Sequence, residues 1–134
     1  KKVATPGAPG HMTVVQGDVL EHPFRPRTFD SALIGFLISH LSDDEERRLF
    51  EHLKVMLDID GRFLIFDSAW SLERARFNAK VERQQRRLND GNAFEIFKRY
   101  IDRQDIDEWN TQHGVTTTIE HFGTAFVAVS GQFT

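Results

Sequence analysis

Apolar positions along the chain fall into blocks that predict strands alternating with helices. Residues 13–20, TVVQGDVL, indicate a short buried strand that stops at a glycine followed by a carboxylate. Residues 29–41, FDSALIGFLISHL, are apolar almost throughout, which is typical of a strand covered on both faces in a parallel sheet. Residues 62–70, RFLIFDSAW, predict a further buried strand after a turn at 58–61.

A helix between the last two of these strands has the clearest signals. Ser42 is placed to cap the helix, and Glu45, three residues later, completes a capping box. Apolar side chains then recur along one helical face, at Leu49, Phe50, Leu53, Met56 and Leu57. Strand, helix and strand with short joints form a βαβ unit, so we expect a parallel sheet here, with helices on both faces.

The next segment has weaker patterns. Residues 71–88 are polar and permissive for a helix, residues 89–92 (NDGN) predict a turn, and residues 93–100 are short and ambiguous. Several Arg and Lys residues fall between Arg74 and Arg87, where they form either a solvated helix face or a phosphate-binding patch.

The C-terminal part predicts one helix and two strands. Residues 102–113 indicate a helix that stops at Gly114. Residues 115–122 and 124–131 indicate an antiparallel pair of strands at the end of the sheet. The predicted fold class is therefore α/β, with a mostly parallel sheet and a C-terminal antiparallel β pair.

Composition narrows the class of protein. The 134 residues are enough for one packed domain, expected over residues 13–134. Residues 1–12 are expected to be a loose arm, in which Gly10-His11-Met12 is similar to a remnant of cloning. A net charge of -3 gives no sign of a nucleic-acid partner. No apolar stretch reaches the roughly 18 residues that span a bilayer, so we expect no membrane partner and a cytoplasmic location.

Polar groups follow each of the three predicted strands. These groups are Gly17-Asp18, Ser39-His40 and Asp67-Ser68. Because ligands of open parallel sheets bind beyond the carboxyl ends of the strands, their shared edge predicts a site. A carboxylate at a strand end is also a common helix cap or turn former, and both interpretations stay open for Asp18 and Asp67.

Side chains for metal or covalent chemistry are scarce. The chain has no cysteine, and its six histidines show neither metal-ligand spacing nor an HExxH motif, so no metal site is expected. No GxSxG motif marks a nucleophilic serine. His40, between a strand and a capped helix, is either a general base or a histidine that hydrogen-bonds the nearby backbone. The aromatic side chains of FEIFKRY and Trp109 either line a pocket or belong to the core.

The order and spacing of these segments resemble the second half of a class I S-adenosylmethionine-dependent methyltransferase domain. The segments that carry the resemblance are VVQGDVLEHPF, FDSALIGFLISHL and SDDEERRLFEHLKVMLDIDGRFLIFDSAW. RRLNDGNAFEIFKRYID and the final β pair are similar to the end of family members that act on small molecules. The resemblance covers nearly all of residues 13–132, and it implies an incomplete Rossmann-like fold.

The resemblance also implies a site for S-adenosylmethionine. Gly17 and Asp18 would follow the family's third strand, where the Asp18 carboxylate accepts a hydrogen bond from the adenine amino group and Val19 flanks the ring. Gly35 and Phe36 would face the sulfonium of the cofactor.

The expected acceptor pocket lies beside this cofactor site. Ser39, Asp67 and Trp70 would border a small-molecule acceptor, with His40 as the base where one is needed. Methyl transfer is an in-line displacement whose reactivity belongs to the cofactor, so the protein mainly supplies alignment.

The chain departs from the family where the cofactor is usually held. The family has a glycine-rich loop, approximately GxGxG, after its first strand, and an acidic residue that holds the ribose after its second. No two of the nine glycines here are two positions apart, and only about twelve residues precede the third-strand segment. We therefore expect a domain that lacks the first two strands and has little activity alone.

The missing strands predict an exposed edge. The family's strand order is 3-2-1-4-5-7-6, so the strand at residues 29–35 would lose its neighbour. We expect either that residues 13–20 move in beside it, or that a second copy covers it in a homodimer. An N-terminal half in a partner chain or a longer protein would also complete the domain.

The sequence is compatible with three hypotheses about the function. The first is a methyltransferase whose missing half lies elsewhere. The second is a non-catalytic oligomeric binding or assembly module built on a methyltransferase-like fold. The third is an unrelated α/β domain, such as a flavodoxin-like one, with a similar pattern.

Overall fold

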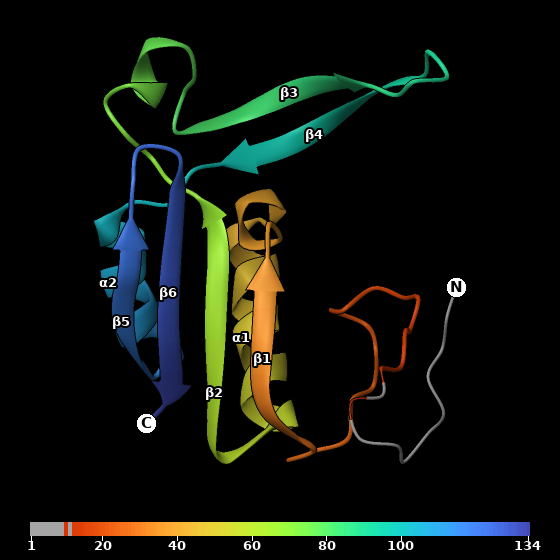
Figure 1. Cartoon of the computed structure of the whole chain (residues 1–134), viewed down its shortest axis with the longest axis vertical. Coiled ribbons are helices and arrows are strands. Elements are labelled where there is room, and N and C mark those ends of the chain that lie inside the picture. Colours follow the sequence, from red (N-terminus) through yellow and green to blue (C-terminus); the bar gives the residue numbers. More distant parts are fainter. Residues whose placement is uncertain (1–9, 11) are drawn as a thin grey trace.

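A four-stranded sheet forms the body of this computed structural model, which describes residue 10 and residues 12–134 (Figure 1). The strand order is β1-β2-β6-β5. The strands are β1 (Phe29–Gly35), β2 (Leu57–Ser68), β6 (Phe126–Phe133) and β5 (Val115–Phe122). β1 and β2 are parallel, whereas β6 is antiparallel to both β2 and β5. This order corresponds to 4-5-7-6 of the expected family order, and the α/β fold class is confirmed.

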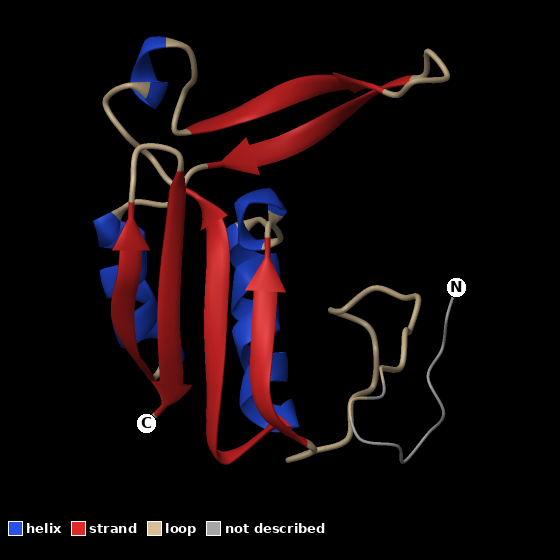
Figure 2. Cartoon of the chain, in the orientation of Figure 1, coloured by secondary structure: helices blue, strands red, loops and turns tan. Residues whose placement is uncertain are grey.

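Two α-helices cover the sheet, and both lie on the same face of it (Figure 2). α1 (Asp43–Met56) connects β1 to β2, and its predicted capping box between Ser42 and Glu45 is confirmed. α2 (Arg103–His113) precedes β5 and ends at Gly114, whose φ of 62° lies in the left-handed region, as predicted. The expectation of helices on both faces is therefore not met by the described residues.

The core lies between this helix pair and the sheet. Phe50 of α1 meets Phe63 of β2 and Trp109 of α2, with ring centroids 5.9 and 5.7 Å apart. The predicted apolar face of α1 is buried. On the opposite face of the sheet Leu33 and Leu64 stay exposed.

β1 is less covered than its sequence predicts. Leu33, in its centre, is 74% exposed, and β1 forms one edge of the sheet. A continuous apolar run is buried only where helices pack on both faces of the strand and other strands pair on both of its sides. β1 has one helix-covered face and one described neighbouring strand. The expectation of a strand covered on both faces is therefore wrong for this chain.

Residues 13–20 form no strand, so the predicted move of this segment into the sheet is wrong. Residues 13–18 are exposed, and Asp18 starts a turn in which its Oδ1 accepts a hydrogen bond from the Leu20 N–H at 2.9 Å. Apolar residues alone do not make a strand, because a strand also needs a hydrogen-bonding neighbour. The expected loose arm at 1–12 lies outside the described residues, apart from Gly10 and Met12.

Residues 71–88 form no α-helix, contrary to the expectation from their polar pattern. They contain the short 3-10 helix η2 (Arg74–Arg76) and the strand β3 (Val81–Arg87). β3 pairs with β4 (Ala93–Arg99) in an antiparallel hairpin that projects from the end of the sheet (Figure 1). The predicted turn at 89–92 is confirmed, and it sets the hairpin because Gly91 takes a φ of 89°.

Candidate functional site

A hollow of about 670 Å³ lies between β1, α1 and the loop that precedes β1. Four of the five residues predicted for the cofactor line it: Gly17, Asp18, Val19 and Gly35. The rest of its wall is mainly apolar. It comes from β1, from α1 with Leu49, Leu53 and Met56, and from the loop residues Phe24 and Leu37 on either side of β1. Two segments far apart in the sequence thus meet at one apolar hollow with a carboxylate at its rim.

Asp18 has one carboxylate oxygen in use. Its Oδ1 accepts from the Leu20 N–H, and its backbone carbonyl accepts from the Glu21 and His22 N–H groups at 3.1 and 2.9 Å. Within the described part of the chain Oδ2 has no hydrogen-bond partner, so it is available as an acceptor. The turn-forming role and the ligand-binding role of Asp18 are compatible.

Phe36, the fifth predicted cofactor residue, lies apart from this hollow. Its ring packs against Phe66 and Phe126 with centroid distances of 5.2 and 5.9 Å. Its backbone has a φ of 52°, held in part by an N–H donated to the Phe66 carbonyl at 2.9 Å. The chain turns sharply at Phe36, and from there it enters the 3-10 helix η1 (Ile38–His40).

The ends of β1 and β2 are joined by a buried polar cluster. Asp67 is fully buried, and its carboxylate accepts from the backbone N–H groups of Ser39 at 3.0 Å and Ser68 at 2.7 Å. Lys98 of β4 donates to the Ser39 and Ser68 hydroxyls at 2.7 and 2.9 Å and lies 3.9 Å from Asp67 Oδ1. We call Ser39, Asp67, Ser68 and Lys98 the Lys98 cluster. The sequence places three of these residues near one another and misses Lys98.

Lys98 belongs to a segment whose pattern was ambiguous. One sequence signal was available, since a lysine within the largely apolar stretch AFEIFKRY is unusual in a strand that packs on a protein body. Lys98 is 7% exposed, and burial lowers the pKa of its ammonium group, although Asp67 opposes that change.

His40 and Trp70 lie beside the hairpin. The exposed His40 ring contacts the Phe97 carbonyl through Nδ1 at 2.9 Å, which leaves Nε2 without a partner in the described part of the chain. Trp70 is half-buried, with its ring centroid 6.0 Å from that of Tyr100. Both predicted acceptor-site residues are therefore reachable, whereas Ser39 and Asp67 are buried.

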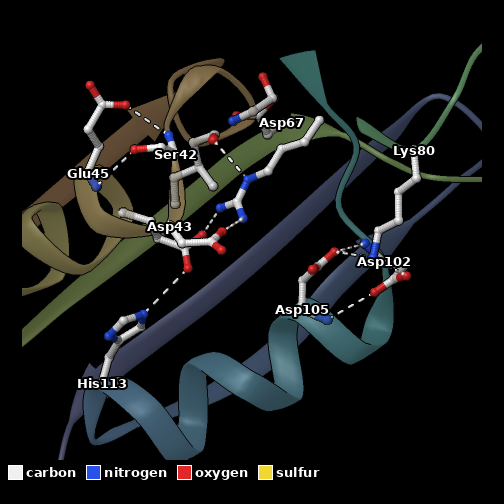
Figure 3. A network of polar contacts seen from close by, with 12 residues as sticks. Ser42, Asp43, Glu45, Asp67, Lys80, Asp102, Asp105 and His113 are labelled. Carbon is white, nitrogen blue, oxygen red and sulfur yellow. Dashed lines mark hydrogen bonds and ion pairs between the residues drawn. The ribbon is translucent and has the colours of Figure 1, made fainter. Parts of the chain in front are cut away.

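A second polar network ties the hairpin and α2 to α1 (Figure 3). Arg99 pairs with Glu46, and Glu46 also lies 3.5 Å from Nε2 of His113. Burial lowers the pKa of His113. Lys80 bridges Asp102 and Asp105 at 2.6 and 3.1 Å, and burial raises the pKa of Asp105. These ion pairs fix the position of the hairpin base.

The described residues contain neither a metal-binding group of side chains nor a membrane-spanning helix. In this part of the chain, no three His, Asp or Glu side chains are grouped so that they could hold a metal ion. None of its helices combines the length and the apolar character required to cross a membrane.

Comparisons with known proteins agree with this architecture. No family model matches the chain. An uncharacterized methyltransferase of Anoxybacillus flavithermus is 24% identical over 110 residues, which are 81% of this chain and 51% of that protein. A second one, from Bacillus cytotoxicus, is 25% identical over 91% of this chain and 58% of its own length. The chain thus spans about half the length of the curated relatives it matches.

Solved structures match over most of the chain as well. The structure of a complex of DhpI with SAH superposes with a TM-score of 0.72, at 19% identity, over 92% of this chain and 55% of that one. The glycopeptide N-methyltransferase MtfA superposes with a TM-score of 0.63, at 15% identity, over 91% of this chain and 61% of the MtfA chain. The fold of this chain matches part of the class I methyltransferase fold, as the resemblance implied.

Proposed function

We propose that this chain is part of an S-adenosylmethionine-dependent methyltransferase that acts on a small molecule. The observation that carries this proposal is the hollow in which Asp18 and Gly35 meet. The resemblance puts the adenine beside Asp18, which lines this hollow, and structural neighbours include DhpI with SAH and MtfA with S-adenosylmethionine.

The residues present fit the adenosyl part of that cofactor. An adenine ring needs an apolar slot and a polar group for its amino nitrogen. The hollow offers apolar walls from Val19, Leu37 and Leu53, and Asp18 Oδ2 as the acceptor. Bound S-adenosylmethionine would supply an electrophilic methyl group, and the chain's own residues would orient the two reactants.

The acceptor would then lie at the same end of the sheet, below the hairpin. Trp70 offers an apolar wall there, and the unpartnered Nε2 of His40 is a candidate base for an acceptor proton. Ser39 and Asp67 would act from behind this wall, by fixing the ends of β1 and β2 relative to each other.

The ribose and methionine parts of the cofactor need further residues, because the chain has no glycine-rich loop. We propose that another segment or a second chain supplies them at the β1 edge, in a cytoplasmic protein. The position of β1 supports this, since among the described residues it pairs only with β2, and an uncovered strand edge is a surface for pairing. The chain alone is then expected to bind the cofactor weakly and to transfer no methyl group.

Calorimetric titration with S-adenosylhomocysteine tests the proposal. We expect weak binding to the wild-type chain, with a Kd above about 0.1 mM because only part of the site is present. The Asp18→Ala variant should lose it, and Asp58→Ala, the same change at an exposed position near the other end of β2, should keep it. Equal binding by Asp18→Ala and the wild type would refute the assigned role of Asp18.

A further inference from the structure

The Lys98 cluster contains hydrogen-bond donors without acceptors. An ammonium group only donates, so the Ser39 and Ser68 hydroxyls act as acceptors toward Lys98 and keep their own protons for other partners. No atom of the described chain accepts either proton. Ser39 is fully buried and Ser68 is 8% exposed, so bulk water does not satisfy them freely.

The cluster also has more positive than negative charge around it. Arg74 places its guanidinium carbon 4.4 Å from the centre of the Tyr100 ring, and Lys98 Nζ lies 5.3 Å from the same centre. Arg74 donates to the carbonyls of Ala69 and Ala125, and no carboxylate pairs with it in the described part of the chain. Asp67 lies 3.9 Å from Lys98 Nζ, and two backbone N–H groups already engage its carboxylate.

We propose that the Lys98 cluster and Arg74 bind an oxyanion group of the methyl acceptor, a carboxylate or a phosphate-type group. This inference rests on the proposed function for the identity of the ligand as a methyl acceptor. The binding of an oxyanion by the cluster does not depend on it. An oxyanion would accept from the Ser68 hydroxyl and balance the second cation, whereas the fully buried Ser39 would hold Lys98 from behind.

Neighbouring groups fit such a ligand. The rings of Trp70 and Tyr100 border the cluster and would cover the organic part of the acceptor. Ser68 and Lys98 are 8 and 7% exposed and Ser39 is fully buried, so the anion would approach from the Ser68 side.

Titration of the isotope-labelled chain with small probes, followed by NMR, tests the inference without any cofactor. The probes are acetate, inorganic phosphate and acetamide, which is the neutral analogue of acetate. We expect saturable shifts of the Ser39 and Ser68 amide signals with at least one anion and none with acetamide. A response to acetate indicates a carboxylate acceptor, and a response to phosphate indicates a phosphate-type one. No saturable shift with either anion, or an equal one with acetamide, would overturn the proposal.

Variants locate the binding. Lys98→Met should abolish the anion response, whereas Lys54→Met, the same change at an exposed position of α1, should leave it unchanged. Should Lys98→Met fail to fold, Ser68→Ala removes one donor and should weaken binding about tenfold. Binding unchanged in Ser68→Ala would count against the cluster. Anion binding without S-adenosylhomocysteine binding would support this inference and contradict the proposed function. S-adenosylhomocysteine binding without anion binding would support the proposed function and contradict this inference.

Discussion

Ser39 donates its backbone N–H to the Asp67 carboxylate across 3.0 Å and so joins the loop after β1 to the end of β2. The two residues are 28 positions apart in the sequence, and both are fully buried. This bond fixes the relative position of two parallel strand ends, where the fold places ligands. The carboxyl edge of the sheet is therefore ordered by the chain itself before any ligand binds.

Removal of the Asp67 carboxylate should cost much of the stability of the protein. Asp67→Ala leaves Lys98 without its facing charge and two backbone N–H groups without an acceptor, a loss of about 3–5 kcal/mol in the free energy of unfolding. Urea denaturation measures this difference. Asp58→Ala, at an exposed position of β2, should change stability by less than about 0.5 kcal/mol. A loss at Asp67 no larger than that at Asp58 would contradict the structure of the cluster.

Gly131 should not tolerate a side chain. A Cβ atom there would lie 2.3 Å from Cζ of Phe63, which packs over it from β2. Gly131→Ala is expected to destabilise the protein by about 1–3 kcal/mol, because a buried aromatic ring must move. Thermal unfolding gives the change. Gly35→Ala is the matched control, since nothing lies within 4 Å of its added Cβ. Equal melting temperatures for the two variants would argue against the packing of Phe63 on β6.

His113 should make the stability of the protein depend on pH. Its ring stacks on Phe50 at 4.3 Å, and burial lowers its pKa below the ordinary value of 6.5. As the pH falls below 6.5, the unfolded chain gains a proton that the folded chain does not, so stability decreases on acidification. His113→Phe keeps the stacking and should show a smaller decrease. Parallel stability curves of the two proteins between pH 7 and 5 would contradict this assignment.

The β1 edge should mediate self-association if a second copy covers it. Leu33 of this edge strand is 74% exposed on the open face of the sheet, and Leu33→Lys puts a charge beside the expected interface. Analytical ultracentrifugation should show dimers of the wild-type chain and monomers of Leu33→Lys. Leu72→Lys, at a loop position that is 91% exposed, should remain dimeric. A wild-type chain that sediments at 15.5 kDa would exclude the homodimer.

The sequence was most informative where local signals and the final packing agree. The capping box at Ser42 and Glu45, the stop at Gly114 and the turn at Gly91 each depend on nearby backbone, and all three were predicted correctly. The βαβ unit and the C-terminal β pair followed from periodicity. Gly17, Asp18 and Gly35 were proposed as one site from a resemblance, and the structure brings them to one hollow.

The errors arose where structure depends on distant partners. Residues 13–20 have the composition of a strand but no neighbouring strand to pair with, and residues 81–87 are polar yet form β3 because the turn at Gly91 pairs them with β4. Lys98 escaped notice because its partners, Ser39 and Ser68, lie 59 and 30 positions away. The local pattern marks Lys98 as unusual, but it does not identify these distant partners.

The most direct test of the account is to map where S-adenosylhomocysteine binds, by NMR of the isotope-labelled chain. We predict weak, saturable shifts of the amide signals of Gly17, Asp18, Val19 and Gly35, which line the hollow beside β1, and their loss in Asp18→Ala. Saturable shifts confined to another part of the chain, or none at all at millimolar ligand, would contradict the proposed cofactor site.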